Sequence, residues 1–377
     1  MVRKIFTTSL AVLFLTINSR AQGTSTATLP DSASATLTTT ESAPQPPATP
    51  EPATTFTASA DVYYRYDLGK TAANNRTSFT NSHNSFELGM VSVKAEHKKG
   101  KVGLLADIGF GKRAEEFSYA DDKTRFLIKQ LNLSYTFKYD IKLTAGSWAT
   151  HVGYEMVDAY ANRNYSMSYM FSYGPFFHTG LKAEKTFGKT GIMFGVANPT
   201  DLKSTTFNRK FMIGQISTAT SDDVFKAWLN YQGGQQNDST RVNQFDLVMT
   251  VAVSPKFNIG ANTTLSNVAT RQLAEDFGAP GHWWGAALYF NADPLDWLGL
   301  TLRTDYFNDA DQINVFSSQP ESGNIFATTF SLNIKTQGLI IIPEIRVEKS
   351  SADMFISSAG KPVSTSTSFL LAAVYKI

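Results

Sequence analysis

The sequence predicts an all-β protein, namely a transmembrane antiparallel up-and-down β-barrel of about sixteen strands with short periplasmic turns and long extracellular loops. Three observations predict it. Apolar and polar residues alternate in one short segment after another. The connections between these segments are long and short in turn. No apolar run is long enough to cross a membrane as a helix, so strands are the elements that would cross it.

The first 21 residues have the pattern of a secretory signal peptide. Arg3 and Lys4 precede an apolar run from Ile5 to Ile17, and Ser19-Arg20-Ala21 supplies the small residues that a signal peptidase requires. The run is too short for a membrane-spanning helix. We therefore expect residues 1–21 to be removed from an exported chain.

Residues 22–54 consist almost entirely of Thr, Ala, Ser and Pro. Such a segment has little to bury against the entropy cost of ordering, so we expect a disordered periplasmic tether. A spacer or an anchor near the peptidoglycan is the alternative. The barrel is then expected over residues 55–377.

Composition narrows the class further. The chain has 377 residues, of which 42% are hydrophobic and 18% charged, and it has no cysteine. A disulfide framework and thiol chemistry are therefore excluded. Removal of Arg3, Lys4 and Arg20 with the signal leaves basic and acidic residues nearly balanced, which does not suggest a nucleic-acid partner.

Alternation starts abruptly at Phe56, where every second residue up to Tyr66 is apolar or aromatic. It recurs in Val102–Phe110, in Phe245–Val253 and in Phe369–Ile377. Sixteen segments of this kind begin near Phe56, Ser85, Val102, Phe126, Ile141, Phe176, Gly191, Phe211, Val224, Val242, Phe257, Trp283, Leu298, Ile325, Leu339 and Thr367.

The lengths of the connections indicate an up-and-down order. Long polar connections are expected at 68–84, 112–124, 150–175, 198–210, 232–241, 266–282, 308–324 and 349–366. Short ones lie between them, such as Lys98-Lys99-Gly100 and Ser254-Pro255-Lys256. This alternation is typical of outer-membrane barrels, and an even strand number places both termini in the periplasm.

The apolar face is expected to contact lipid. A barrel of about sixteen strands has an interior too wide for side chains to fill, so the polar face lines water. Closure also leaves no unpaired backbone edge in hydrocarbon. Aromatic residues near the expected ends of strands, such as Tyr135, Phe137, Trp297, Trp283 and Trp284, suit the two membrane interfaces.

Several segments resemble one family. These are Gly146–Glu155, Asn162–Ser166, Pro175–Gly180, Ala60–Tyr64 and Leu302–Asp309. They resemble the β-barrel porins called OmpL-like, which are frequent in Bacteroidota, and the resemblance covers essentially 56–377. It implies an outer-membrane porin and does not imply a particular solute.

The connection 150–175 is the longest and is the candidate constriction, because in porins of this size a long loop often folds into the lumen. We expect its His151, Glu155, Asp158 and Arg163 to narrow the pore, the last three as opposed charges. Alternatively these are ordinary solvated loop charges. The five tyrosines of this connection could instead form a stacking track for sugars, or simply attach the loop to the wall.

Charged and amide side chains that fall on the polar face of the strands are the candidate lumen wall, because a basic residue facing lipid at the midplane would cost about 2–4 kcal/mol. They are Asp61, Arg65, Asp107, Gln130, Asp246, Arg303, Asp305, Glu344 and Arg346. Arg303, Glu344 and Arg346 are near enough in strand order to form a ladder of ion pairs. Lining water without pairing is the alternative.

The sequence thus favours a diffusion channel for small hydrophilic solutes or ions, integral to the outer membrane of a Gram-negative cell. It predicts no cofactor, no metal, no catalytic residues and no nucleic-acid partner, with lipid around the barrel. Whether barrels form a homotrimer stays open, as does the solute. Two rivals remain: a barrel hydrolase of the outer membrane, and a structural or adhesive barrel whose lumen is blocked.

Overall fold

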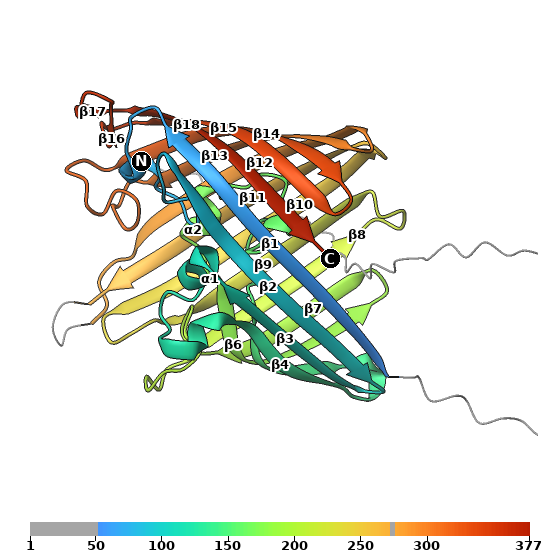
Figure 1. Cartoon of the computed structure of the whole chain (residues 1–377). Coiled ribbons are helices and arrows are strands. Elements are labelled where there is room, and N and C mark those ends of the chain that lie inside the picture. The colour runs from blue at the N-terminus through green and yellow to red at the C-terminus, as the bar shows by residue number, and fades with distance from the viewer. Residues whose placement is uncertain (1–51, 272–275) are drawn as a thin grey trace, which may run out of the picture.

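A computed structural model describes residues 52–271 and 276–377, in which sixteen antiparallel strands close into a barrel (Figure 1). The strands of the barrel are β1 Ala53–Asp67, β2 Ser85–Lys99, β3 Val102–Phe110, β4 Ile128–Thr136, β5 Lys142–Ala149, β6 Phe177–Phe187, β7 Thr190–Ala197, β8 Phe211–Ala219, β9 Phe225–Gln235, β10 Thr240–Ser254, β11 Phe257–Thr270, β12 Gly281–Leu295, β13 Leu298–Asp309, β14 Gly323–Thr336, β15 Leu339–Ser350 and β18 Thr365–Lys376. The prediction of an all-β up-and-down barrel is confirmed, and each predicted segment begins within three residues of a strand. The predicted signal peptide and nearly all of the tether lie outside the described residues.

Closure joins the first and last strands. β1 pairs with β18 over Ser59–Asp67, and Ala58 and Ile377 exchange backbone hydrogen bonds beyond that register. The remaining strands pair in sequence order. No strand of the barrel therefore keeps a free edge, which is the condition for a sheet in hydrocarbon.

The helices are short and belong to the connections. They are α1 Lys112–Phe117, α2 Tyr169–Ser172 and the 3-10 turns η1 Ala72–Asn74, η2 Lys123–Leu127, η3 Lys138–Asp140 and η4 Ala159–Ala161. None of the helices in the described ranges has the length and hydrophobicity of a membrane span.

Two connections differ from the prediction. The expected long loop 232–241 is mostly strand, because β9 and β10 continue their ladder to Gln235 and from Thr240. Polar side chains there indicated a loop, but a strand that extends beyond the membrane into water has no need of an apolar face. Within 349–366 a small hairpin also forms, from β16 Phe355–Ile356 and β17 Pro362–Val363.

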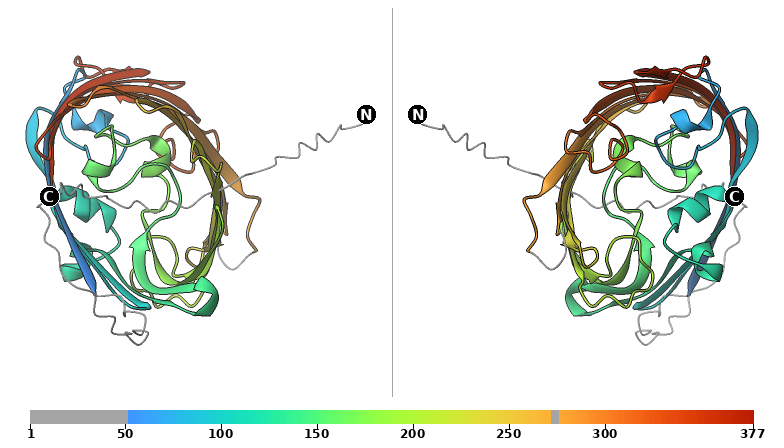
Figure 2. Two further views of the ribbon diagram at one scale, coloured as in Figure 1. Left: turned by 90° about the vertical axis from the view of Figure 1, so that its right-hand side faces the viewer. Right: turned by 90° about the vertical axis from the view of Figure 1, so that its left-hand side faces the viewer.

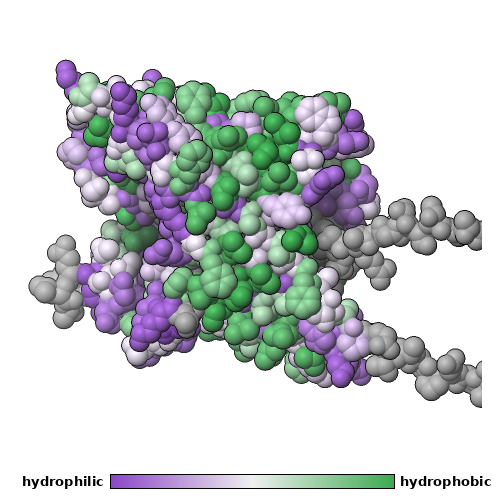
Figure 3. All heavy atoms as spheres, in the orientation of Figure 1, coloured by the Kyte–Doolittle hydropathy of each residue, from purple (hydrophilic) through white to green (hydrophobic). Residues whose placement is uncertain are grey.

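Side chains alternate between an apolar outer face and a polar inner face. On β15, Val347 is 46% exposed on the outside, whereas its neighbours Arg346 and Glu348 are 3% and 2% exposed. On the face drawn in Figure 3, an apolar belt consequently lies between two polar ends. Of the two neighbouring tryptophans assigned to the interface, Trp284 is exposed but Trp283 is buried, packed against Phe307.

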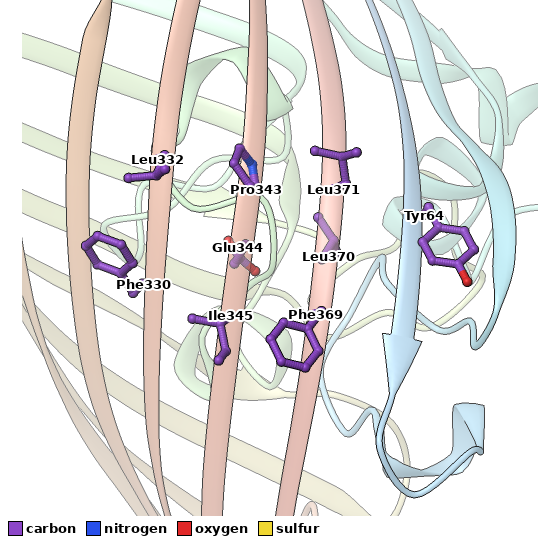
Figure 4. Close-up of a pocket in the computed structure, with 9 residues that line it drawn as sticks. All are labelled: Tyr64, Phe330, Leu332, Pro343, Glu344, Ile345, Phe369, Leu370 and Leu371. Carbon is purple, nitrogen blue, oxygen red and sulfur yellow. The ribbon is translucent and has the colours of Figure 1, made fainter.

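The outer face of β14, β15, β18 and β1 has a shallow apolar hollow of about 400 Å³. Phe330, Ile345, Phe369 and Leu371 project from neighbouring strands around it (Figure 4). Glu344, in the same row, is buried on the inner side of β15. In this part of the wall, apolar side chains face outward and the Glu344 carboxylate faces inward.

Candidate functional site: the lumen and the loop inside it

The connection between β5 and β6 lies inside the barrel. We call residues 150–175 the inner loop; it carries η4 and α2, and a view along the barrel places it within the ring of strands (Figure 2). Tyr165, Met167 and Tyr169 of this loop are fully buried. The inner loop therefore narrows the lumen, as the sequence predicted.

Arg303 on β13 makes the central contacts that attach the inner loop to the barrel wall. Its guanidinium donates to Glu155 Oε1 at 2.7 Å, to the Ser166 carbonyl oxygen at 2.7 Å and to Asp305 Oδ1 at 3.1 Å. The side chain is 0% exposed. A buried guanidinium is stable only when its donors are satisfied, so this strand and both halves of the inner loop are held together.

Asp158 is held on the other side of the barrel, by Lys129 on β4. The Lys129 ammonium also pairs with Asp107 at 3.1 Å and donates to Ser92 Oγ at 2.8 Å. The register between β3 and β4 shifts at Asp107, which pairs with Gln130, whereas Ile108 pairs with Ile128. Lys129 is the extra residue of this bulge, and it is buried although strict alternation places it outside.

Arg163 pairs with Asp293 on β12, whose Oδ1 also accepts a hydrogen bond from Lys335 Nζ at 2.7 Å. The three charged residues of the predicted constriction thus contact three different parts of the wall and are not paired with one another. His151 is half-buried, with its Nε2 3.1 Å from the Tyr231 carbonyl oxygen. Burial lowers the pKa of His151 to about 4, so this side chain is neutral at pH 7.

The tyrosines of the inner loop pack against the wall. Tyr154 stacks on Tyr289 at 4.0 Å between ring centroids. Tyr165 donates to Asp61, and Tyr169 donates to Glu348 Oε1 at 2.7 Å. Each of these three side chains contacts the wall, which favours the interpretation that the tyrosines attach the loop over the interpretation that they form a sugar track.

Two acidic wall residues accept hydrogen bonds both from the inner loop and from neighbouring strands. Glu344 accepts hydrogen bonds from the Tyr165 amide at 2.9 Å and from Ser331 Oγ at 2.8 Å. Asp246 accepts from the Gly153 amide at 2.9 Å and from Thr264 Oγ1 at 2.6 Å. Backbone amides of the loop therefore act as the counterparts of wall carboxylates.

The basic wall residues pair along their own strands. Arg65 donates to Asp67 at 3.1 Å, and Arg346 lies 3.0 Å from Glu348. Arg346 also donates to the Met167 carbonyl oxygen at 2.9 Å. The expected ladder of Arg303, Glu344 and Arg346 does not form. Arg303 pairs with Glu155 and Asp305, Arg346 pairs with Glu348, and Glu344 accepts from the inner loop instead.

All the predicted wall residues except Gln130 are buried. Gln130 is half-buried, donates to Asp107 at 3.1 Å and accepts from the Ala149 amide at 3.1 Å. Sequence reasoning missed Lys129, Asp293 and Arg113. Arg113 of α1 lies between the rings of Phe79 and Tyr165, with its Nε 3.9 Å from Asp61, and no pattern in the sequence indicates that contact.

Space remains at both ends of the lumen. At the end of the barrel that carries the long connections, a cavity of about 540 Å³ is lined by Asn81, Glu116, Tyr119, Tyr173 and Asp201. At the end that carries the short turns, a cavity of about 580 Å³ is lined by residues of β4 to β8.

Solved structures share this fold. An anion-selective porin from Comamonas acidovorans superposes with a TM-score of 0.58 at 11% identity, covering 87% of this chain and 100% of that one. OmpT of Vibrio cholerae, an outer membrane protein, gives 0.58 at 9% identity as a loop L8 deletion mutant, covering 86% and 99%. Its trimer form gives 0.56 at 10% identity, covering 86% and 99%. At these identities the likeness shows the fold alone.

No curated protein sequence matches the chain. A family model does, and it matches residues 53–377, which is the whole barrel. The closed barrel, the inner loop and this match agree: the protein is an outer-membrane porin and belongs to the family described as "Putative beta-barrel porin-2, OmpL-like".

Proposed function

We propose that the protein lets small hydrophilic solutes and ions diffuse passively through a lumen that the inner loop narrows. The observation that carries this proposal is the attachment of that loop to opposite sides of the wall, through Arg303 on β13 and Lys129 on β4. A loop attached in this way gives a passage of fixed width, and such a passage selects solutes by size.

In this proposal His151, Glu155, Asp158 and Arg163 set the position of the constriction. The geometry favours that role over a charge filter of their own, because Glu155 and Asp158 are buried in ion pairs and His151 is neutral. These four residues would then limit the width of the passage and would not select solutes by charge. We propose no enzymatic activity and no cofactor.

We also propose that residues 1–21 are removed, that 22–54 form the tether, and that both termini are periplasmic. The last point is supported by the pairing of β1 with β18, which brings Ala58 and Ile377 together. A homotrimer is the oligomer that we propose, since OmpT, which shares the fold, has a trimer form.

Planar-bilayer recording of the purified protein tests the pore. We expect stepwise conductance, and proteoliposomes should swell with small uncharged solutes but not with larger ones. Heat-denatured protein in the same detergent is the control. Absence of both conductance and swelling would establish a blocked, structural barrel. Turnover of lipids or peptides by the same preparation would favour the hydrolase.

A further inference from the structure

The cavity at the periplasmic end of the lumen has a distinctive set of charges. Its lining comes from β4 to β8 and the turn before β5, and includes Thr136, Asp140, Lys142, Glu184 and Gln215. Lys142 and Glu184 lie directly opposite each other on β5 and β6. A solute that leaves the barrel on this side passes these side chains.

One carboxylate is shared by two ammonium groups. Glu184 lies 3.1 Å from Lys182 Nζ and 3.6 Å from Lys142 Nζ. Asp140 and Lys185 also line the cavity and are opposite in sign, so they cancel. The group of Lys142, Lys182 and Glu184, which we call the basic mouth, therefore leaves one positive charge in excess.

The basic mouth faces the lumen. Lys182 pairs across the sheet with Thr144, which is buried, and its ammonium lies 5.2 Å from the centroid of the buried Trp148 ring. Leu181, the residue before it, is exposed on the outer face. Gly191 and Met193 on β7 line the same cavity and leave room beside the charges.

The arrangement recurs on the far side of the lumen. Asp293 is shared by Arg163 and Lys335, which again leaves one positive charge in excess. Two other clusters have one basic group and two acidic groups. Lys129 is shared by Asp107 and Asp158, and Arg303 is shared by Glu155 and Asp305.

Exposure separates the two kinds of cluster. The side chains of Lys142 and Glu184 are 49% and 32% exposed, whereas those of Lys129 and Arg303 are 1% and 0% exposed. A mobile ion reaches these two clusters more readily than the buried ones, although Lys182 is only 15% exposed, and both clusters carry excess positive charge. Their field acts at short range and is weakened by salt.

We propose that the basic mouth binds small anions, such as chloride, inorganic phosphate and short carboxylates, and makes the channel prefer anions to cations. The ammonium groups supply the charge, and Gln215, Thr136 and Ser217 supply neutral hydrogen-bonding groups beside them. Lysine suits this task because its three donors rotate to fit an anion in transit. The inference rests on the proposed pore and deepens it.

Reversal potentials under a KCl gradient test the proposal. Wild-type protein should pass chloride in preference to potassium at low ionic strength. The double variant Lys142→Gln/Lys182→Gln changes the net charge of the basic mouth from +1 to −1, and it should lower the chloride-to-potassium permeability ratio about two- to fivefold, because these charges act across several ångströms of water. Glu184→Gln should raise that ratio.

Lys138→Gln is the matched control. Lys138 belongs to the periplasmic turn before β5, and its ammonium lies 5.0 Å from the centroid of the exposed Tyr139 ring. This variant should leave the permeability ratio unchanged. Inorganic phosphate should reduce the chloride current of the wild type more than that of the double variant.

The outcomes separate the two proposals. Conductance with no anion preference, or a preference that the double variant retains, would overturn the basic mouth and leave the pore intact. Absence of conductance in all variants would overturn the pore itself. Correct folding of each variant is checked by its heat-modifiable migration in gels.

Discussion

Asp201 shows how a single loop residue can couple the fold to pH. It lies between β7 and β8, where its carboxylate accepts hydrogen bonds from the Phe176 and Phe177 amides at 2.7 and 3.0 Å. Tyr119 donates to its other oxygen at 3.2 Å. Burial raises the pKa of Asp201 from 3.8 to about 7, and these hydrogen bonds oppose the rise only in part.

A carboxyl group whose pKa is higher in the folded than in the unfolded protein stabilises the fold at low pH. Asp201 should therefore lower the free energy of unfolding as pH rises from about 4 to about 7, by a few kcal/mol at most. Asp201→Asn keeps an acceptor for both amides and should remove this dependence. Unfolding in detergent, followed between pH 4 and 8, measures the effect. If both proteins show the same pH profile, Asp201 is not the group responsible.

For single residues, the sequence predicted which side chains face the lumen better than it predicted the residues with which they pair. Alternation alone predicted Asp61, Arg303 and Glu344 on the polar face, and the structure buries all three. Lys129 could not be predicted, because a bulge reverses its direction. Asp293 depends on where the inner loop runs, and strand periodicity says nothing of that path.

At the scale of elements, the inner loop is the least predictable part of the molecule. Its length and position between the fifth and sixth strands were evident in the sequence, but its contacts are long-range. Asn164, for example, donates to Ser331 Oγ on β14 at 2.7 Å, and Arg303 binds carbonyl oxygens on the same stretch. These contacts depend on barrel closure, so no local pattern encodes them.

The fixed position of the inner loop can be tested with a cross-link. The chain has no cysteine, so Asn164→Cys/Ser331→Cys introduces a unique pair. We expect a disulfide to form under oxidising conditions and to stabilise the fold by about 2–4 kcal/mol. Conductance should be the same with and without reductant, because the loop is already held there. The two single-cysteine variants are the controls. A conductance that falls on oxidation would mean that the loop must move for solutes to pass.

At the scale of the whole molecule, the apolar belt and the inner polar face determine the orientation of every strand. This was the part of the fold that the sequence predicted best, because period-two alternation and connection length are both local. Leu133 and Ser134 on β4 illustrate it: Leu133 is 59% exposed, and Ser134 is half-buried beside Thr144 on the next strand.

These two neighbours provide a matched test of the belt. Leu133→Arg should destabilise the folded barrel in lipid vesicles, by up to about 2–4 kcal/mol at the bilayer midplane. Ser134→Arg should cost much less, because its side chain enters the lumen. Denaturant titrations followed by tryptophan fluorescence measure both. Equal losses would contradict the assignment of the two faces.

The barrel closes only when β1 hydrogen-bonds to β18. A sheet with fewer strands is therefore not stable in a bilayer. A molecule that lacks β18 would present two rows of bare amides and carbonyls to hydrocarbon. The barrel can then insert into the membrane only as a whole, after β18 has been synthesised. Nascent or truncated chains would stay outside the membrane, where proteases can degrade them. The pairing of β1 with β18 thus ensures that only complete chains enter the membrane.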